Sequence, residues 1–201
     1  MTSNEHRKRI RRFELVQHLH ELTFSCYHQR PLLADNNRCR ILAESLDDAC
    51  RNECFQLIAF VFMPDHVHLL VWPQDRNSQV SRLLARIKQP TTSCIRRLLE
   101  QTGSRLLDEL LVRQASGRAS LRFWQQGPGF DRNMFSPAAI EASIDYIHRN
   151  PVRRKLCVRP EEYKWSSARF YLDGTRDHDL PELTLPDALW LDDSGHQTEH
   201  A

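Results

Sequence analysis

Two histidines, His66 and His68, flank a valine inside an apolar run. Side chains alternate between the two faces of a β-strand, so both imidazoles would point the same way. Their bases would then stand roughly 6–7 Å apart, close enough to converge on one ion. A second pair, His18 and His20, competes for this role. It lies at the polar start of an expected strand, beside a basic segment, so we interpret it as an exposed pair.

Residues 137–150 predict an amphipathic helix that carries further candidate groups. At about 100° per residue, three isoleucines form one stripe that should pack on a sheet: Ile140, Ile144 and Ile147. Tyr146 and Asn150 are four residues apart and share a flank of that stripe, so they could address one site together. His148 falls on the other flank. Plain structural roles also fit, since a tyrosine here can be half-buried packing and an asparagine before proline can end a helix.

The elements that must position these groups follow from hydrophobic periodicity and turn residues. Strands are expected over residues 16–27, 55–62, 66–72 and 121–135, and helices over 35–53, 78–101 and 137–150. Pro90 should kink or split the second helix, and Pro151 should end the third near Asn150. The order strand, helix, strand, strand, helix, strand predicts an α+β fold with a ferredoxin-like antiparallel sheet and helices packed on it.

The 201 residues suggest one domain over residues 13–174, between a basic arm at 1–12 and a polar, partly disordered tail at 175–201. The net charge is only +2, so binding to an anion must come from local clusters. No stretch approaches the ~20 apolar residues of a membrane span, and the N-terminus does not resemble a secretory signal. We therefore expect a cytoplasmic protein whose six cysteines are reduced thiols.

Several separated motifs resemble, in order, the REP-associated tyrosine transposases, which belong to the HUH-type single-tyrosine transposases. They are Met63-Pro64-Asp65-His66-Val67-His68-Leu69-Leu70, Trp124-Gln125, Asp131-Arg132, Tyr146-Ile147-His148-Arg149-Asn150-Pro151-Val152 and Trp165-Ser166-Ser167-Ala168-Arg169. The resemblance covers about residues 13–173 and implies a ferredoxin-like (RRM-like) fold of the HUH endonuclease type. It implies that a divalent ion, Mg²⁺ or Mn²⁺, is bound by His66, His68 and Asn150, and that Tyr146 is the nucleophile. The implied substrate is single-stranded or hairpin DNA.

The types of these residues suit a metal-assisted attack of a tyrosine on a phosphodiester. Two imidazoles and an amide oxygen are neutral ligands, so the ion would keep its full charge beside the scissile phosphate. A phenol is a poor nucleophile at neutral pH and must lose its proton before it attacks. The resemblance implies that the attack by Tyr146 gives a 5′-phosphotyrosine and a free 3′-OH. Because the bond energy is kept, the reverse step can rejoin a different strand.

Basic and aromatic residues would hold the DNA. Phosphate contacts are expected from five residues on and after the last helix: Arg149, Arg153, Arg154, Lys155 and Arg159. Arg7, Lys8 and Arg9 form a phosphate-binding arm or a solvated terminus, and sequence weighs the two equally. Trp124 and Trp165 could stack on unpaired bases or pack in the core. Asp65 could orient a histidine or simply form the turn after Pro64.

Two other functions remain open on sequence alone. One is a domesticated, non-catalytic protein that binds hairpin DNA with the same surface. The other is a metal-binding ferredoxin-like domain that acts on RNA. The joint presence of His66, His68, Tyr146 and Asn150 favours the enzyme. The sequence allows either a monomer or a homodimer.

Overall fold

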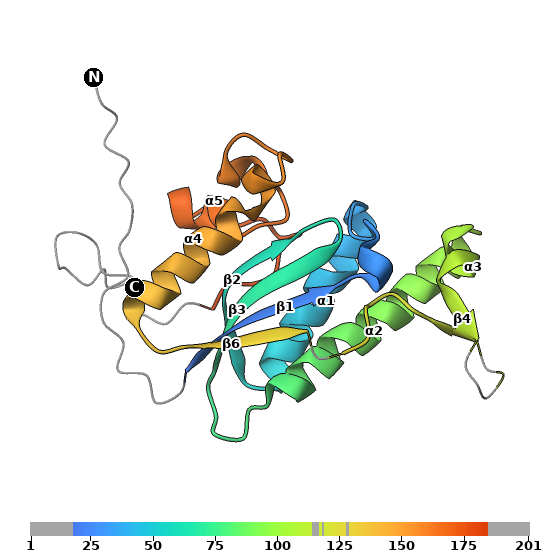
Figure 1. The fold of residues 1–201 in the computed structure, drawn as a ribbon, viewed down its shortest axis with the longest axis horizontal. Helices are drawn as coiled ribbons and strands as arrows, with labels where there is room; N and C mark the ends of the chain where they lie inside the picture. The colour runs from blue at the N-terminus through green and yellow to red at the C-terminus, as the bar shows by residue number, and fades with distance from the viewer. Residues whose placement is uncertain (1–17, 114–116, 118, 128, 185–201) are drawn as a thin grey trace.

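A four-stranded antiparallel sheet lies at the centre of the computed structural model, which describes residues 18–113, 117, 119–127 and 129–184 (Figure 1). Its strands are β1 (Leu19–Ser25), β2 (Phe55–Phe62), β3 (His66–Pro73) and β6 (Phe130–Met134), in the spatial order β2-β3-β1-β6. The helices are α1 (Asn36–Asn52), α2 (Val80–Gln101), α3 (Leu106–Leu110), α4 (Pro137–Arg153) and α5 (Ala168–Asp173). A small hairpin, β4 (Leu111–Arg113) and β5 (Ala119–Leu121), and two 3₁₀ turns, Tyr27–Gln29 and Pro160–Glu162, complete the elements.

The order β1-α1-β2-β3-α2-β6 is that of a ferredoxin-like domain, so the predicted fold class is confirmed. Helices α1 and α2 cover one face of the sheet, and α4 crosses the other (Figure 1). Leu22 and Phe24 of β1 point into the α1/α2 core, whereas Leu19 points toward α4. The isoleucine stripe of α4 packs on the sheet as expected, and burial of each such side chain contributes about 1.5–3 kcal/mol.

Local signals set the starts of the helices. The Asp35 carboxylate accepts a 3.0 Å hydrogen bond from the Arg38 N–H and caps α1. The Ser136 hydroxyl accepts a 3.3 Å bond from the Ala139 N–H, and Pro137 occupies the first turn of α4. Each cap is worth about 1 kcal/mol. Both helices therefore begin where the sequence predicts.

Two helices continue through a proline, so α2 is not split at Pro90 and the predicted end of α4 near Asn150 is wrong. Helix α2 is one continuous helix through Pro90, and α4 runs past Pro151 to Arg153. In α4, packing of the buried stripe outweighs the one backbone hydrogen bond that Pro151 cannot donate. The helix ends instead at Arg153, and Lys155, two residues later, has a φ of +57°. The Leu156 N–H donates to the Pro151 carbonyl over this turn.

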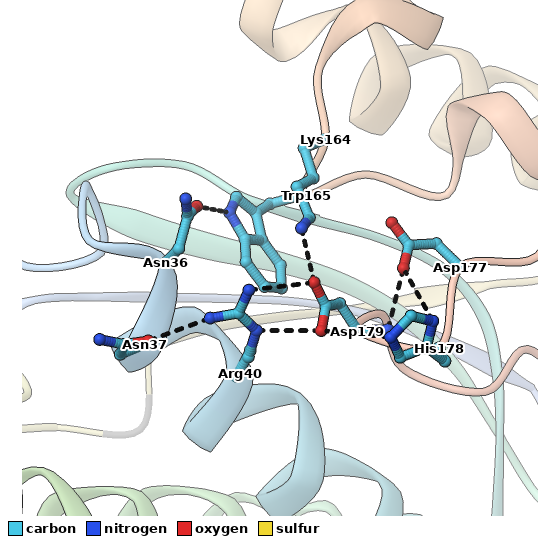
Figure 2. Close-up of polar contacts among 8 residues, drawn as sticks. All are labelled: Asn36, Asn37, Arg40, Lys164, Trp165, Asp177, His178 and Asp179. Atoms are coloured by element: carbon cyan, nitrogen blue, oxygen red, sulfur yellow. Dashed lines mark hydrogen bonds and ion pairs between the residues drawn. The ribbon is translucent and has the colours of Figure 1, made fainter.

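Residues 175–184, the first part of the tail that was expected to be partly disordered, run back along the domain. The Asp179 carboxylate accepts bonds from Arg40 at 2.9 Å and Lys164 at 2.6 Å, and Figure 2 shows the three side chains converging. The Thr184 N–H donates to the Leu57 carbonyl, so the segment reaches the start of β2. An acidic residue of this segment thus pairs with basic side chains of the domain. Residues 1–17, which include Arg7, Lys8 and Arg9, and residues 185–201 lie outside the described residues.

The described part of the chain contains no helix that is long and apolar enough to cross a membrane. All six cysteines lie within the described residues and are free thiols. Burial raises the pKa of Cys26, Cys39 and Cys50 to about 12, so these three are protonated packing residues.

Candidate active site

The two histidines of β3 converge as the strand period predicts. In the sheet register His68 lies opposite Thr23 of β1, on the face that α4 crosses. The His66 and His68 Nε2 atoms are 3.0 Å apart. Two nitrogens that each lie about 2.1 Å from one ion, at a right angle, are about 3.0 Å apart. The pair therefore has the spacing of two ligands of a single divalent ion.

The other ring nitrogens are held by neighbouring side chains. His66 Nδ1 donates to the Asp65 carboxylate at 2.7 Å, which leaves the His66 Nε2 lone pair free in the neutral ring. His68 Nδ1 lies 2.9 Å from the Thr23 hydroxyl. A hydroxyl can accept or donate, so Thr23 can satisfy either tautomer of His68. When it accepts, both Nε2 lone pairs are available to a metal.

The local electrostatics favour neutral histidine. Burial, together with the neighbouring His66, lowers the pKa of His68 to about 4. Burial raises the pKa of Asp65, but hydrogen bonds and charge from His66 and Arg154 outweigh this, and the net shift is downward. At neutral pH His68 is therefore an uncharged imidazole, and Asp65 is a carboxylate that can orient His66.

Helix α4 brings Tyr146 to the histidines. The ring centroids of Tyr146 and His68 are 5.5 Å apart in an edge-to-face arrangement, and 40% of Tyr146 is exposed. The Asn150 side-chain nitrogen donates to the Tyr146 carbonyl at 2.8 Å, which leaves the Asn150 side-chain oxygen for another partner. Tyr146 is thus a reachable phenol beside a possible metal site, and Asn150 offers a neutral oxygen ligand one helical turn away.

The chain's other tyrosines are poorly placed for chemistry. Tyr163 and Tyr171 donate to the carbonyls of Phe62 and Ile58, and burial raises the pKa of both phenols. Tyr27 is half-buried against His28 in a 3₁₀ turn. Among the four, only Tyr146 combines exposure with a histidine pair.

The predicted phosphate-binding residues separate into different roles. The Arg153 guanidinium lies 5.2 Å from the centroid of the Tyr146 ring, so it carries positive charge next to the phenol. Arg154 donates to Asp65 at 2.6 Å and ties the end of α4 to the turn that precedes the histidine pair. Arg149 pairs with Asp145 on the exposed helix surface, and Lys155 is exposed at the helix end.

Other predicted candidates lie elsewhere. His148 is buried and bonds to the Ser167 hydroxyl, in keeping with its place on the other flank of α4. His20 bonds to Asp131 and faces the side of the sheet opposite His68, so the His18/His20 pair does not join the site. Trp124 and Trp165 are both buried in the α1/α2 core, which rules out base stacking by their rings in this conformation.

A separate group of possible ligands, Asp177, His178 and Asp179, lies in the segment after α5 (Figure 2). Asp179 is already engaged by Arg40 and Lys164, and these two bonds lower the pKa of its carboxyl. His178 is almost fully exposed. This group is accounted for by the ion pairs that hold the segment.

Sequence reasoning missed residues on β1 that support the site. Thr23 holds His68, and the buried Glu21 accepts bonds from Arg132 of β6 at 2.8 Å and Ser143 of α4 at 3.0 Å. Glu21 therefore links two strands to the helix that carries Tyr146. The sequence contains one signal for these residues: Leu19, Glu21 and Thr23 alternate along β1 and so share one face of the strand. That alternation does not predict which residues of other elements contact them.

Comparison with solved structures gives a match to a structure described as a REP-associated tyrosine transposase bound to a REP hairpin. It has a TM-score of 0.58 at 17% identity and covers 90% of this chain and 95% of that one. A candidate transposase from Deinococcus radiodurans R1 has a TM-score of 0.39 at 19% identity, covering 70% and 95% of the two chains. A search of curated proteins gave no match. At this identity the first match shows a shared fold.

The family model described as "Transposase IS200 like" matches residues 15–149, which is more than half of the chain. The matched range includes β1, the histidine pair and Tyr146, and it ends one residue before Asn150. The resemblance to transposases noted from the motifs is thereby confirmed. The chain belongs to the IS200-like transposase family.

Proposed function

We propose that this chain cleaves and rejoins single-stranded or hairpin DNA through Tyr146. The observation that carries the proposal is the position of the exposed Tyr146 ring, 5.5 Å from His68, on the helix that also carries Asn150. Membership of a transposase family and the fold shared with a hairpin-bound transposase support DNA as the substrate.

We propose His66, His68 and Asn150 as ligands of a divalent ion, Mg²⁺ or Mn²⁺. Such an ion would supply positive charge at the scissile phosphate. Asp65 and Thr23 hold the two imidazoles in place through their Nδ1 atoms. Ligands fixed in this way lose less conformational freedom when they bind.

The chain's own groups account for the rest of the reaction. The Arg153 guanidinium, 5.2 Å from the centroid of the Tyr146 ring, places a positive charge where it attracts the phosphate. The Tyr146 oxygen attacks phosphorus, the bond to the 3′ oxygen breaks, and a 5′-phosphotyrosine forms. The phenol proton passes to water, and the 3′ oxygen takes a proton from water. In the reverse direction a 3′-OH attacks the phosphotyrosine and releases Tyr146.

A covalent-adduct assay tests this proposal. A labelled single-stranded DNA library that contains imperfect hairpins is incubated with the protein and Mg²⁺ or Mn²⁺, then separated under denaturing conditions. We expect a protease-sensitive adduct that disappears with chelator and with Tyr146→Phe and persists with Tyr27→Phe. An adduct of equal yield with Tyr146→Phe would overturn the proposal. Hairpin binding that persists in chelator, without any adduct, would identify a non-catalytic DNA-binding protein instead.

A further inference from the structure

An exposed phenylalanine lies on the same face of the sheet as the histidine pair. Thr23 of β1 is paired with His68 on one side and with Phe130 of β6 on the other. Side chains directly opposite one another in antiparallel strands point to the same face. Neighbouring strands are about 4.8 Å apart, so the Phe130 and His68 Cα atoms are about 10 Å apart. Phe130 thus lies in one cross-strand row with the site.

Among the described residues, Phe130 belongs to neither of the two buried hydrophobic clusters. It is 55% exposed on the edge strand of the sheet, and among the described residues it stacks on no other aromatic ring. A single exposed apolar residue is common, so exposure alone means little. Its position in the same cross-strand row as His68, on an edge strand of the sheet, is what suggests a ligand.

The guanidinium of Arg132 lies on the same face as Phe130 and is held in place by a buried carboxylate. Arg132 follows Phe130 by two residues and points to the same side, opposite Glu21. Its guanidinium is bonded to the buried Glu21 carboxylate, while the side chain remains 55% exposed. The edge of the sheet therefore presents an aromatic face and a positively charged group in succession, and groups of these two kinds bind bases and phosphates in single strands.

The backbone holds Phe130 close to β1. Gly129 has a φ of +80°, and a Cβ at this position would lie 2.2 Å from the Thr23 carbonyl oxygen. Only glycine permits this approach, which begins β6 against the residue that holds His68. The position of Phe130 relative to the metal ligands is therefore set by the fold rather than by a free loop.

We propose that Phe130 is a stacking platform for an unpaired base next to the scissile phosphate, with Arg132 contacting the backbone of the same strand. The inference deepens the proposed function and rests on it, because the strand would be the one that Tyr146 attacks. Base stacking is tolerant of sequence and is worth about 1–3 kcal/mol per base. The platform would align the strand and leave recognition of a hairpin stem to other surfaces.

Equilibrium binding tests the platform separately from cleavage. Fluorescence anisotropy is measured with labelled oligo-dT and with a blunt-ended hairpin duplex, in chelator, so that no cleavage is required. We expect Phe130→Ala to weaken oligo-dT binding roughly five- to 150-fold, the equivalent of one lost stack, and to leave binding of the blunt hairpin unchanged. Phe130→Trp should retain oligo-dT binding because it keeps an aromatic face.

Phe135 provides the matched control. It is 70% exposed, lies just beyond the end of β6 and packs on His18, away from the site. Phe135→Ala should bind both probes like the unmodified protein. Unchanged oligo-dT binding by Phe130→Ala, or an equal loss with Phe135→Ala, would overturn the platform. Loss of the Tyr146 adduct alone would refute the proposed cleavage but leave this binding result intact.

Discussion

Replacing Gly129 with alanine should destabilise the protein through a defined backbone collision. The left-handed conformation costs a residue with a Cβ about 1–2 kcal/mol. The new Cβ would also meet the Thr23 carbonyl oxygen at 2.2 Å, and that oxygen cannot move without disturbing β1. Overpacking of this kind adds about 1–3 kcal/mol. We therefore expect Gly129→Ala to lower the free energy of unfolding by about 2–5 kcal/mol.

Urea unfolding at neutral pH measures this loss, and Gly174 offers a control with a similar positive φ. Gly174 has a φ of +78°, and a Cβ there would meet no atom within 4 Å. Gly174→Ala should therefore cost only the conformational part, about 1–2 kcal/mol. Equal losses for the two variants would refute the reasoning, because they would show that β6 does not press against Thr23.

Three further predictions concern the histidine pair. The pKa of His68 is lowered from an ordinary 6.5 to about 4 in the folded protein. The unfolded chain therefore binds more protons than the folded protein between these two pH values. The free energy of unfolding of the metal-free protein should fall by about 3 kcal/mol as the pH drops from 6.5 to 4. His68→Gln should flatten this part of the pH dependence in urea unfolding, and an unchanged slope would contradict the assignment. Asp65→Asn should weaken Mn²⁺ binding about 10- to 100-fold in calorimetry, because His66 loses its orienting carboxylate. Thr23→Val should weaken it by about tenfold through loss of the bond to His68, and undiminished affinity in either variant would argue against these supporting roles.

Much of the site could be predicted because its parts are local in sequence. His66 and His68 are two residues apart on a strand, and Tyr146 and Asn150 are four apart on a helix. These spacings alone fix which side chains share a face. Apolar runs and capping residues likewise predicted the order of strands and helices. The packing of α4 on the sheet then brought the two local patterns together.

The missed features depend on contacts between distant segments. The register of β1 with β3 and β6 places Thr23 and Phe130 on the face of the histidine pair, and the pairing partners of Thr23 are 45 and 107 residues away along the chain. No local spacing reports such a register. The predicted end of α4 was wrong because packing of its apolar stripe outweighed the effect of Pro151. The composition of residues 175–201 indicated a partly disordered tail, and it could not show that two basic side chains hold Asp179.

The central claim is that Tyr146 carries the DNA during the reaction. The most direct measurement is mass spectrometry of the tryptic peptides after the protein has reacted with the hairpin library in Mn²⁺ and the DNA has been trimmed by nuclease. We predict a nucleotide mass on the peptide of residues 133–149, which contains Tyr146 as its only tyrosine. A nucleotide on the peptide of Tyr27, Tyr163 or Tyr171, with the 133–149 peptide unmodified, would contradict the account.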